Sequence, residues 1–172
     1  MPKRSERVID YSVFLSGTEY LGTATADLPE ISFLSETIKG AGISGEIDAP
    51  SPGQTSAMTL TLNWNVVEKA SLKLLAPVVH ALDLRASVQQ FDTATNEYKE
   101  SALKITVRGR PLSGGLGGLE AATAMSSTTA FSINYLKVLI DGEEILEIDK
   151  LNYIFKVLGK DYQAQTRANL AL

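Results

Sequence analysis

The chain has 172 residues and a mass of 18.5 kDa, the size of one compact domain over residues 1–172, and its hydrophobic content of 44% suffices for a single core. It contains no cysteine and one histidine, which excludes disulfides, thiol nucleophiles and the usual Cys/His zinc sites. Lysines and arginines number 16 against 20 aspartates and glutamates, a net charge of −4, so we expect no tight binding to nucleic acid through phosphate contacts.

The first predicted elements are strands. Val8 to Ser16 is rich in β-branched and aromatic residues, Glu19 to Leu21 can return beside it, and Ile31 to Lys39 alternates. The apolar residues after Val8 also alternate with polar ones and never form a signal-peptide core. No apolar run approaches the roughly 20 residues that cross a bilayer. We therefore expect a soluble protein with no membrane anchor.

The stretch Gly40 to Gln54 is expected to be a long loop. Its glycines and prolines interrupt both helical and strand patterns, and loops of this length inside compact domains are usually functional. The residues that mark this loop are Gly40, Gly42, Gly45, Asp48, Pro50 and Pro52.

Met58 to Trp64 is the clearest predicted strand, because apolar and polar residues alternate strictly along it. The apolar face is made of Met58, Leu60, Leu62 and Trp64, and the polar face of Thr59, Thr61 and Asn63. Asn65 is a suitable N-cap, and the apolar spacing that follows predicts one helix over Val66 to Ala76. We expect the apolar face of the strand to pack against this helix.

The second half of the chain predicts two hairpins. Leu84 to Phe91 and Ala102 to Arg110 alternate on either side of Asp92 to Glu97. Phe131 to Ile140 and Glu144 to Asp149 flank Asp141-Gly142, the strongest short hairpin signal in the sequence. The fold expected from all these elements is mainly β, an antiparallel β-sandwich or partly open barrel with one packed α-helix.

Two further segments complete the chain. The glycine-rich segment 113–119 is expected to be a flexible loop, since it lacks the Lys-Ser/Thr ending of a P-loop and the strand-to-helix spacing of a dinucleotide fingerprint. The C-terminal tail 160–172 has helical character around Tyr162 to Ala168.

Candidate catalytic and metal-binding groups are few. His80 has no neighbouring Ser or Asp in a nucleophile motif, which favours a structural role. Alternation spreads Glu143, Glu144, Glu147 and Asp149 over both faces of a short strand, which favours a solvated or interface surface over a carboxylate pair or a hard-cation site. We expect no catalytic residue, no metal and no cofactor.

The last third of the chain resembles a known family. The residues that carry the resemblance are Tyr135-Leu136-Lys137, Asp141-Gly142-Glu143-Glu144, Glu147-Ile148-Asp149, Asn152, Gly159-Lys160-Asp161, Arg167 and Leu170-Ala171-Leu172. In order and spacing they resemble the ending of the major tail tube proteins of contractile-tailed phages and R-type bacteriocins. Upstream, Gly40-Ala41-Gly42 and Asp48-Ala49-Pro50 resemble that family's long loop between two inner strands. Lys150 stands where the family often has proline, and Tyr153 stands where it usually has glycine.

The resemblance implies a structural protein and not an enzyme. It implies hexameric rings that stack into a hollow tube, with strands of each subunit joining an inter-subunit β-barrel. The implied partners are further copies of the chain, a sheath protein outside, a tape measure protein and passing DNA in the lumen, and baseplate and tail terminator proteins at the ends. It places the protein in the inner tube of the virion tail, after a soluble stage in the host cytoplasm.

Three groups of residues are the candidate functional residues on this interpretation. The polar face of the clearest strand, Thr59, Thr61 and Asn63, would line the lumen. The loop over Gly40 to Gln54 would stack rings. The motif residues expected at subunit contacts are Lys137, Asp141, Gly142, Glu147, Asp149, Asn152, Asp161 and Arg167.

Other classes of function stay open at this point. A secreted tube protein of the type VI kind would share the ring fold. A monomeric β-sandwich binding module would need a pocket with aromatic platforms, whereas the aromatic residues are scattered along this chain. An enzyme that uses the carboxylates between Glu143 and Asp149 is the weakest alternative.

Overall fold

The computed structural model describes residues 3–22 and 25–172, and all its strands pair antiparallel. The strands are β1 (Lys3–Leu15), β2 (Glu19–Leu21), β3 (Thr25–Asp27), β4 (Phe33–Ile38), β5 (Ile47–Thr55), β6 (Met58–Trp64), β7 (His80–Asp92), β8 (Glu97–Gly115), β9 (Ser127–Ile140), β10 (Glu143–Asp149), β11 (Ile154–Val157) and β12 (Lys160–Asp161). The helices are α1 (Lys69–Lys73) and α2 (Ala164–Leu170). The expected mainly β, antiparallel fold is confirmed.

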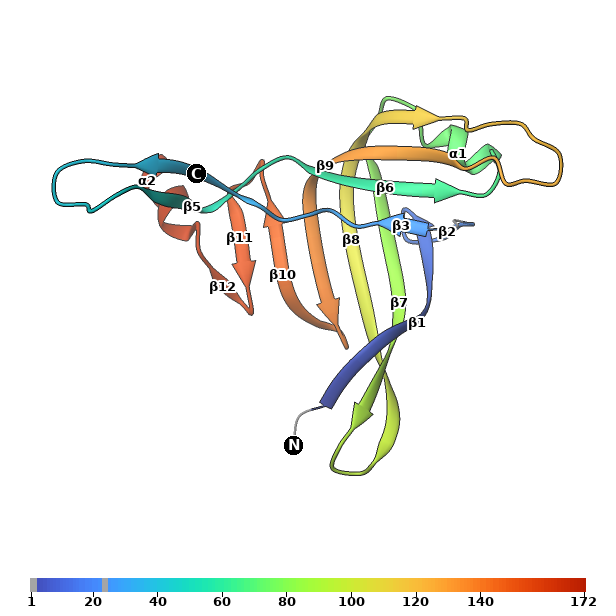
Figure 1. Cartoon of the computed structure of the whole chain (residues 1–172), viewed down its shortest axis with the longest axis horizontal. Coiled ribbons are helices and arrows are strands. Elements are labelled where there is room, and N and C mark those ends of the chain that lie inside the picture. Colours follow the sequence, from blue (N-terminus) through green and yellow to red (C-terminus); the bar gives the residue numbers. More distant parts are fainter. Residues whose placement is uncertain (1–2, 23–24) are drawn as a thin grey trace.

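One large sheet forms both layers of the body. Its strands follow the order β12-β11-β10-β9-β8-β7-β1-β2, and β6 joins it through β9, with β3 beyond β6. The first half of β9 pairs with β6 and the second half with β10. Register shifts in the β8–β9 pairing, at Arg108/Gly109 and Pro111/Ser113, bend both strands, so that β6 and β3 run across the direction of β7 to β10 (Figure 1). The sheet folds over itself without closing into a barrel.

The core lies between these two layers, and β6 supplies its centre. Met58, Leu60, Leu62 and Trp64 are at most 1% exposed, whereas the side chains between them are exposed or half-buried. The predicted division of this strand into two faces is confirmed. The indole Nε1 of Trp64 donates a hydrogen bond to Oγ1 of buried Thr129 on β9, at 3.2 Å, so its polar atom is satisfied inside the core.

The predicted helix over Val66 to Ala76 is present but much shorter than expected. Only α1, five residues long, is helical, and its N-cap is Glu68 instead of Asn65. Of the apolar residues that suggested the helix, Leu74 is fully buried but Val66 is 50% exposed. The core that covers β6 is therefore built mainly by other strands. β-Branched Val66 and Val67 at one end and Pro77 at the other oppose a longer helix.

The predicted loop over Gly40 to Gln54 is also wrong in part. Residues 47–54 belong to β5, which pairs with β4 as a separate two-stranded sheet. Among the described strands β5 pairs with β4 alone, and Pro52 lies in the register shift between the Phe33–Thr55 and Ser35–Pro50 pairs; edge strands and bulges are the places in a sheet that tolerate proline. This β4–β5 hairpin projects from the body at the left of Figure 1, and every side chain of β4 is exposed.

The glycine-rich segment 113–119 begins as strand rather than loop, because β8 continues through Gly115. Gly114 pairs with Thr129 of β9, and a Cβ at Gly114 would lie 2.4 Å from Cδ2 of Leu75. Glycine at position 114 therefore lets β8 pass close to Leu75, in the segment that follows α1.

The two predicted hairpins are present, and the β7–β8 pair is longer than expected. At the β9–β10 turn Asp141 and Gly142 have φ values of 51° and 83°, as a type I′ turn requires. The Asp141 carboxylate accepts hydrogen bonds from the backbone N–H of Ala102, at 2.8 Å, and the hydroxyl of Ser101, at 2.9 Å. The tail helix falls close to its expected place as α2, whereas β3, β11 and β12 were not expected.

Candidate functional site

The polar face of β6 continues across its neighbours. Thr59, Thr61 and Asn63 lie opposite Ser132, Ala130 and Thr128 of β9, and paired residues share one face of a sheet. Further residues on this face are Thr25 and Asp27 of β3, and Arg110 and Ser113 of β8. Short hydroxyl side chains thus dominate the face, and Asp27 and Arg110 are its charged groups among these residues.

Asn63 ties two strands of this face together. Its Nδ2 donates to Oγ1 of Thr25 and to Oδ2 of Asp27, both at 2.9 Å. The side-chain amide therefore holds β3 on the edge of β6, in addition to their backbone ladder. The sequence predicted that Asn63 faces away from the core, but not this role.

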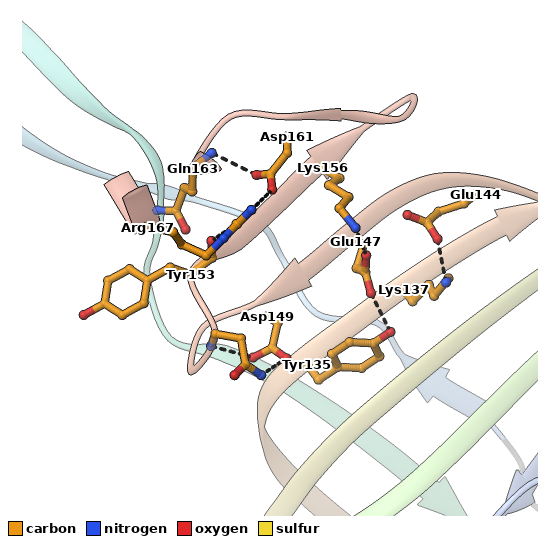
Figure 2. A network of polar contacts seen from close by, with 11 residues as sticks. Tyr135, Lys137, Glu144, Glu147, Asp149, Tyr153, Lys156, Asp161, Gln163 and Arg167 are labelled. Atoms are coloured by element: carbon orange, nitrogen blue, oxygen red, sulfur yellow. Dashed lines mark hydrogen bonds and ion pairs between the residues drawn. The ribbon is translucent and has the colours of Figure 1, made fainter. Parts of the chain in front are cut away.

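A second polar region is a network on β9 to β12 that contains most of the motif residues (Figure 2). Glu147 on β10 is its centre, since Oε1 accepts a hydrogen bond from the hydroxyl of Tyr135 and Oε2 accepts one from Nζ of Lys156, each at 3.0 Å. Lys137 on β9 forms an ion pair with Glu144 at 2.5 Å. The network crosslinks three adjacent strands on one face.

The pKa values in this network follow from its contacts. Burial raises the pKa of Tyr135 to about 12, and its hydrogen bond to the Glu147 carboxylate adds to the rise. Burial alone would raise the pKa of Glu147, but the hydrogen bonds from Lys156 and Tyr135 outweigh it and hold this pKa below its ordinary value. At neutral pH Glu147 is therefore an anion that accepts from a protonated tyrosine and a protonated lysine.

The remaining motif residues fix the C-terminal turns. Asp149 accepts hydrogen bonds from the backbone N–H groups of Leu151 and Asn152, at 3.0 and 3.1 Å, and from Nδ2 of Asn152 at 2.6 Å. Tyr153, which stands at the family's glycine position, has a φ of 51°. The turn keeps the left-handed backbone that favours glycine, although the residue is tyrosine.

Helix α2 is attached through Arg167. Its guanidinium donates to Oδ2 of Asp161 and to the carbonyl oxygen of Tyr153, both at 2.6 Å. The other carboxylate oxygen of Asp161 accepts from the backbone N–H of Gln163 at 3.0 Å. The expected subunit-contact residues Lys137, Asp141, Glu147, Asp149, Asn152, Asp161 and Arg167 thus all make side-chain contacts within the chain, and their role between subunits stays a prediction.

The C-terminal region also contacts the base of the β4–β5 hairpin. Nζ of Lys150 donates to the backbone carbonyls of Ser56 and of Thr55, and burial lowers the pKa of this lysine. The rings of Phe33 and Phe155 stand 5.5 Å apart. The sequence showed only that Lys150 stands where the family often has proline. It did not predict the contacts of Lys150 with Thr55 and Ser56.

The same contacts account for the groups that suggested chemistry. Among the described residues no group of three or more His, Asp or Glu side chains is arranged to hold a metal ion. Glu144, Glu147 and Asp149 are each engaged with partners inside the chain. His80 is buried, with Nε2 3.1 Å from the carbonyl oxygen of Ala76 and its ring against Phe131.

The acid stability of this network can be predicted from Glu147 and Asp161. The pKa of Asp161 is also lowered, because bonds from Arg167 and Gln163 outweigh burial. Two carboxyls with depressed pKa values in the folded state bind fewer protons there than in the unfolded state, so their stabilisation is present above their ordinary values of 4.5 and 3.8 and is lost as the pH falls through the folded values.

We therefore expect the denaturant midpoint to fall progressively below about pH 5. The Glu147→Gln variant should show a weaker dependence over the same range, because its amide does not titrate. Urea unfolding at a series of pH values provides the measurement. An equally steep fall in the variant and the unmodified chain would contradict a role for Glu147.

The ionic groups described above hold neighbouring strands together, and apolar side chains on the surface are left exposed. In the described segments, 3–22 and 25–172, no helix is long and apolar enough to span a membrane. The family described as "Phage tail tube protein FII" matches residues 5–170. The chain belongs to the phage tail tube protein family, and its predicted assignment as a structural, non-enzymatic protein is confirmed.

Individual relatives agree with this family. The chain is 30% identical to the tail tube protein of Escherichia phage P2 over 168 residues, which cover 94% of each chain. It is 25% identical to the major tail tube protein of Serratia phage KSP20 over 159 residues, covering 88% of this chain and 86% of that protein. A solved structure of the sheath/tube terminator of an extracellular contractile injection system shares the fold, with a TM-score of 0.54 at 16% identity over 78% of this chain and 95% of that one.

Proposed function

We propose that this chain forms the inner tube of a contractile phage tail, as hexameric rings stacked around a lumen that conducts DNA and holds a tape measure protein. A sheath would surround the tube, and baseplate and terminator proteins would cap it. The observation that carries the proposal is the hydroxyl-rich face of β6 and its neighbours, because it lies directly opposite the core and its residues on β6 are exposed or half-buried.

This face suits a channel for DNA. Thr59, Thr61 and Asn63 present short, uncharged side chains, and the net charge of the chain is −4. Phosphate groups are held to proteins chiefly by lysine and arginine. A face on which hydroxyls dominate, and on which Asp27 offsets the charge of Arg110, therefore gives DNA little to adhere to. We propose that these three residues line the lumen.

Free strand edges supply the means of joining copies. β2 pairs only with Val13 to Leu15 of β1, and among the described strands no other one pairs with the outer edge of β1 from Arg4 to Asp10. β3 likewise has β6 on one side and no strand on the other among the described elements. Such edges are templates for pairing with another chain. We propose that they join an inter-subunit β-barrel.

The β4–β5 hairpin is the proposed ring-stacking element, with its turn over residues 39–46 at the tip. The motif residues of β9 to α2 hold the region on which its base rests, through Lys150 and Phe155. We propose that the outward-facing parts of this region also contact neighbouring subunits. Before assembly the subunits would be soluble in the host cytoplasm.

Electron microscopy of the purified chain, combined with a Thr61→Lys variant, tests the proposal. Rings or tubes are expected from both forms, because Thr61 is only half-buried on a polar face. Tubes of the variant should retain short duplex DNA on sedimentation at low salt and release it as salt rises, since added lysines attract phosphates within about 8 Å, the Debye length at physiological salt.

Thr61→Ser is the matched control, and its tubes should not retain DNA. Featureless monomers of the unmodified chain under all assembly conditions would contradict the tube. If Thr61→Lys forms normal tubes that retain no DNA at low salt, the placement of Thr61 in the lumen is contradicted. An unfolded Thr61→Lys chain would show that Thr61 is packed inside the subunit, which would contradict its placement in the lumen.

A further inference from the structure

One end of the molecule carries a concentration of exposed apolar side chains. They come from the segment around α1, from the last residues of β8 and from the connection between β8 and β9, which lie at the right of Figure 1. We call the following residues the apolar end surface: Leu72, Val78, Val79, Leu112, Leu116 and Leu119. The two segments touch, since the backbone N–H of Met125 donates to the carbonyl oxygen of Asn65 at 2.7 Å.

The degree of exposure is unusual for a free surface. Leu119 is 89% exposed, Leu112 63% and Leu116 59%. Single exposed leucines need no explanation, but a cluster of them marks a site of interaction. Nothing else in the described part of the chain covers these side chains.

The opposite end of the molecule carries a matching feature. In the β4–β5 hairpin Ile38 pairs with Ile47 next to the turn, and they are 48% and 54% exposed. Leu34 and Glu36 lie on the same face of β4 as Ile38 by strand alternation. The hairpin thus presents an apolar cross-strand pair with a carboxylate beside it, at the far end of the long axis from the apolar end surface (Figure 1).

One acidic group of the hairpin and two basic groups near the apolar end surface form no ion pair within the described residues, and Glu120 beside Leu119 is a further acidic group at that end. Glu36 forms no ion pair within the described residues, whereas Lys39 at the turn is paired with Glu46 at 3.6 Å. Lys69 lies three residues before Leu72 on α1, and Arg110 lies two residues before Leu112 on β8; neither makes an ion pair inside the described portion of the chain. An apolar contact between the ends would therefore bring free charges of opposite sign together at its rim.

We propose that the apolar end surface of one copy receives the β4–β5 hairpin of a copy in the next ring. Ile38 and Ile47 pack against Leu116 and Leu119 in this contact, and Glu36 lies towards Lys69 or Arg110. The inference rests on the proposed tube function and supplies the acceptor surface for the hairpin. Because the two surfaces differ and lie at opposite ends, the contact is heterologous and repeats without closing on itself.

A pair of introduced cysteines tests this contact, and the chain is suited to it because it has no cysteine of its own. A double variant, Ile38→Cys with Leu116→Cys, is assembled into tubes and oxidised. Denaturing gels without reductant should then show a ladder of linked subunits that continues beyond the six copies of one ring. Each single-cysteine variant should remain monomeric on the same gel.

The matched control combines Ile38→Cys with Tyr98→Cys. Tyr98 is 66% exposed but lies at the start of β8, near the β7–β8 turn at the bottom of Figure 1, so this pair should give no ladder. A second test pair replaces Leu116→Cys by Leu119→Cys, in case the first pair disturbs the connection between β8 and β9. Melting temperatures of all variants establish that they are folded.

Each outcome has a definite meaning. Tubes in which neither test pair forms a ladder overturn the proposed contact and leave the tube function standing. A ladder that stops at six copies places the contact within a ring and overturns its inter-ring assignment. Dimers from the Ile38→Cys single variant indicate a hairpin-to-hairpin contact and also overturn it. Absence of tubes from the unmodified chain contradicts the proposed function itself.

Discussion

The Leu62→Ala variant is expected to lose about 2–5 kcal/mol of unfolding free energy, because it leaves a cavity at the centre of the core. Leu62 is fully buried on β6 and belongs to the hydrophobic core cluster, whose members lie mainly on strands. Denaturant unfolding of the unassembled subunit measures the loss, from the transition midpoint and its slope.

Thr61→Ala is the matched control, one residue away on the opposite face of the same strand. Its side chain is half-buried, so the change is expected to stay within about 0.5 kcal/mol. Equal losses in the two variants would mean that both faces of β6 are packed in the isolated subunit, contrary to the assignment of one face to the core.

A second large effect is expected at Gly109, where β8 bends. A Cβ at this position would lie 2.5 Å from the backbone carbonyl oxygen of Ser132 and 2.7 Å from Cδ1 of Ile133. The isoleucine can shift, but the carbonyl belongs to the β9 backbone and the bend would have to open. We expect Gly109→Ala to lower the unfolding free energy by about 1–3 kcal/mol, as overpacked cores do.

Gly118→Ala is the comparison, since a Cβ there would meet nothing within 4 Å. Thermal unfolding of the two variants side by side should show a lower melting temperature for Gly109→Ala alone. A melting temperature for Gly109→Ala equal to that of the unmodified chain would show that the two strands can separate at the bend without loss.

The sequence predicted those elements whose local pattern matches their burial in the single chain. β6 alternates and is buried on one face, so its period of two was enough to assign both faces. Asp141-Gly142 is a turn because both residues tolerate a positive φ. The prediction failed in part for Val66 to Ala76, where the apolar residues gave a helical period but only Leu74 among them is fully buried. It failed again at Pro50 and Pro52, because an edge strand tolerates proline as readily as a loop does.

The candidate site was predictable as a set of residues but not as a set of contacts. The motif located Glu147, Asp161 and Arg167, yet nothing local indicates that Arg167 reaches the carbonyl of Tyr153. Lys150 and the carbonyls it contacts are separated by more than 90 positions, so only the folded chain brings them together. Tyr153 shows the limit of a motif, since the left-handed turn persists at a strain of the order of 1 kcal/mol without the expected glycine.

The pairing of β1 with β7 has a consequence for the order of events in the cell. Arg7 of β1 contacts Gln89 of β7, 82 positions later in the chain, and Trp64 contacts Thr129 across 65. Chains dominated by such distant contacts fold slowly, in milliseconds to seconds, because the entropy of closing a long loop is lost before the stabilising contacts between the strands can form. β1 can form its pairing with β7 only once β7 has been synthesised. We therefore expect each copy to finish folding before it can add to a growing polymer, so that synthesis and polymerisation occur as successive steps.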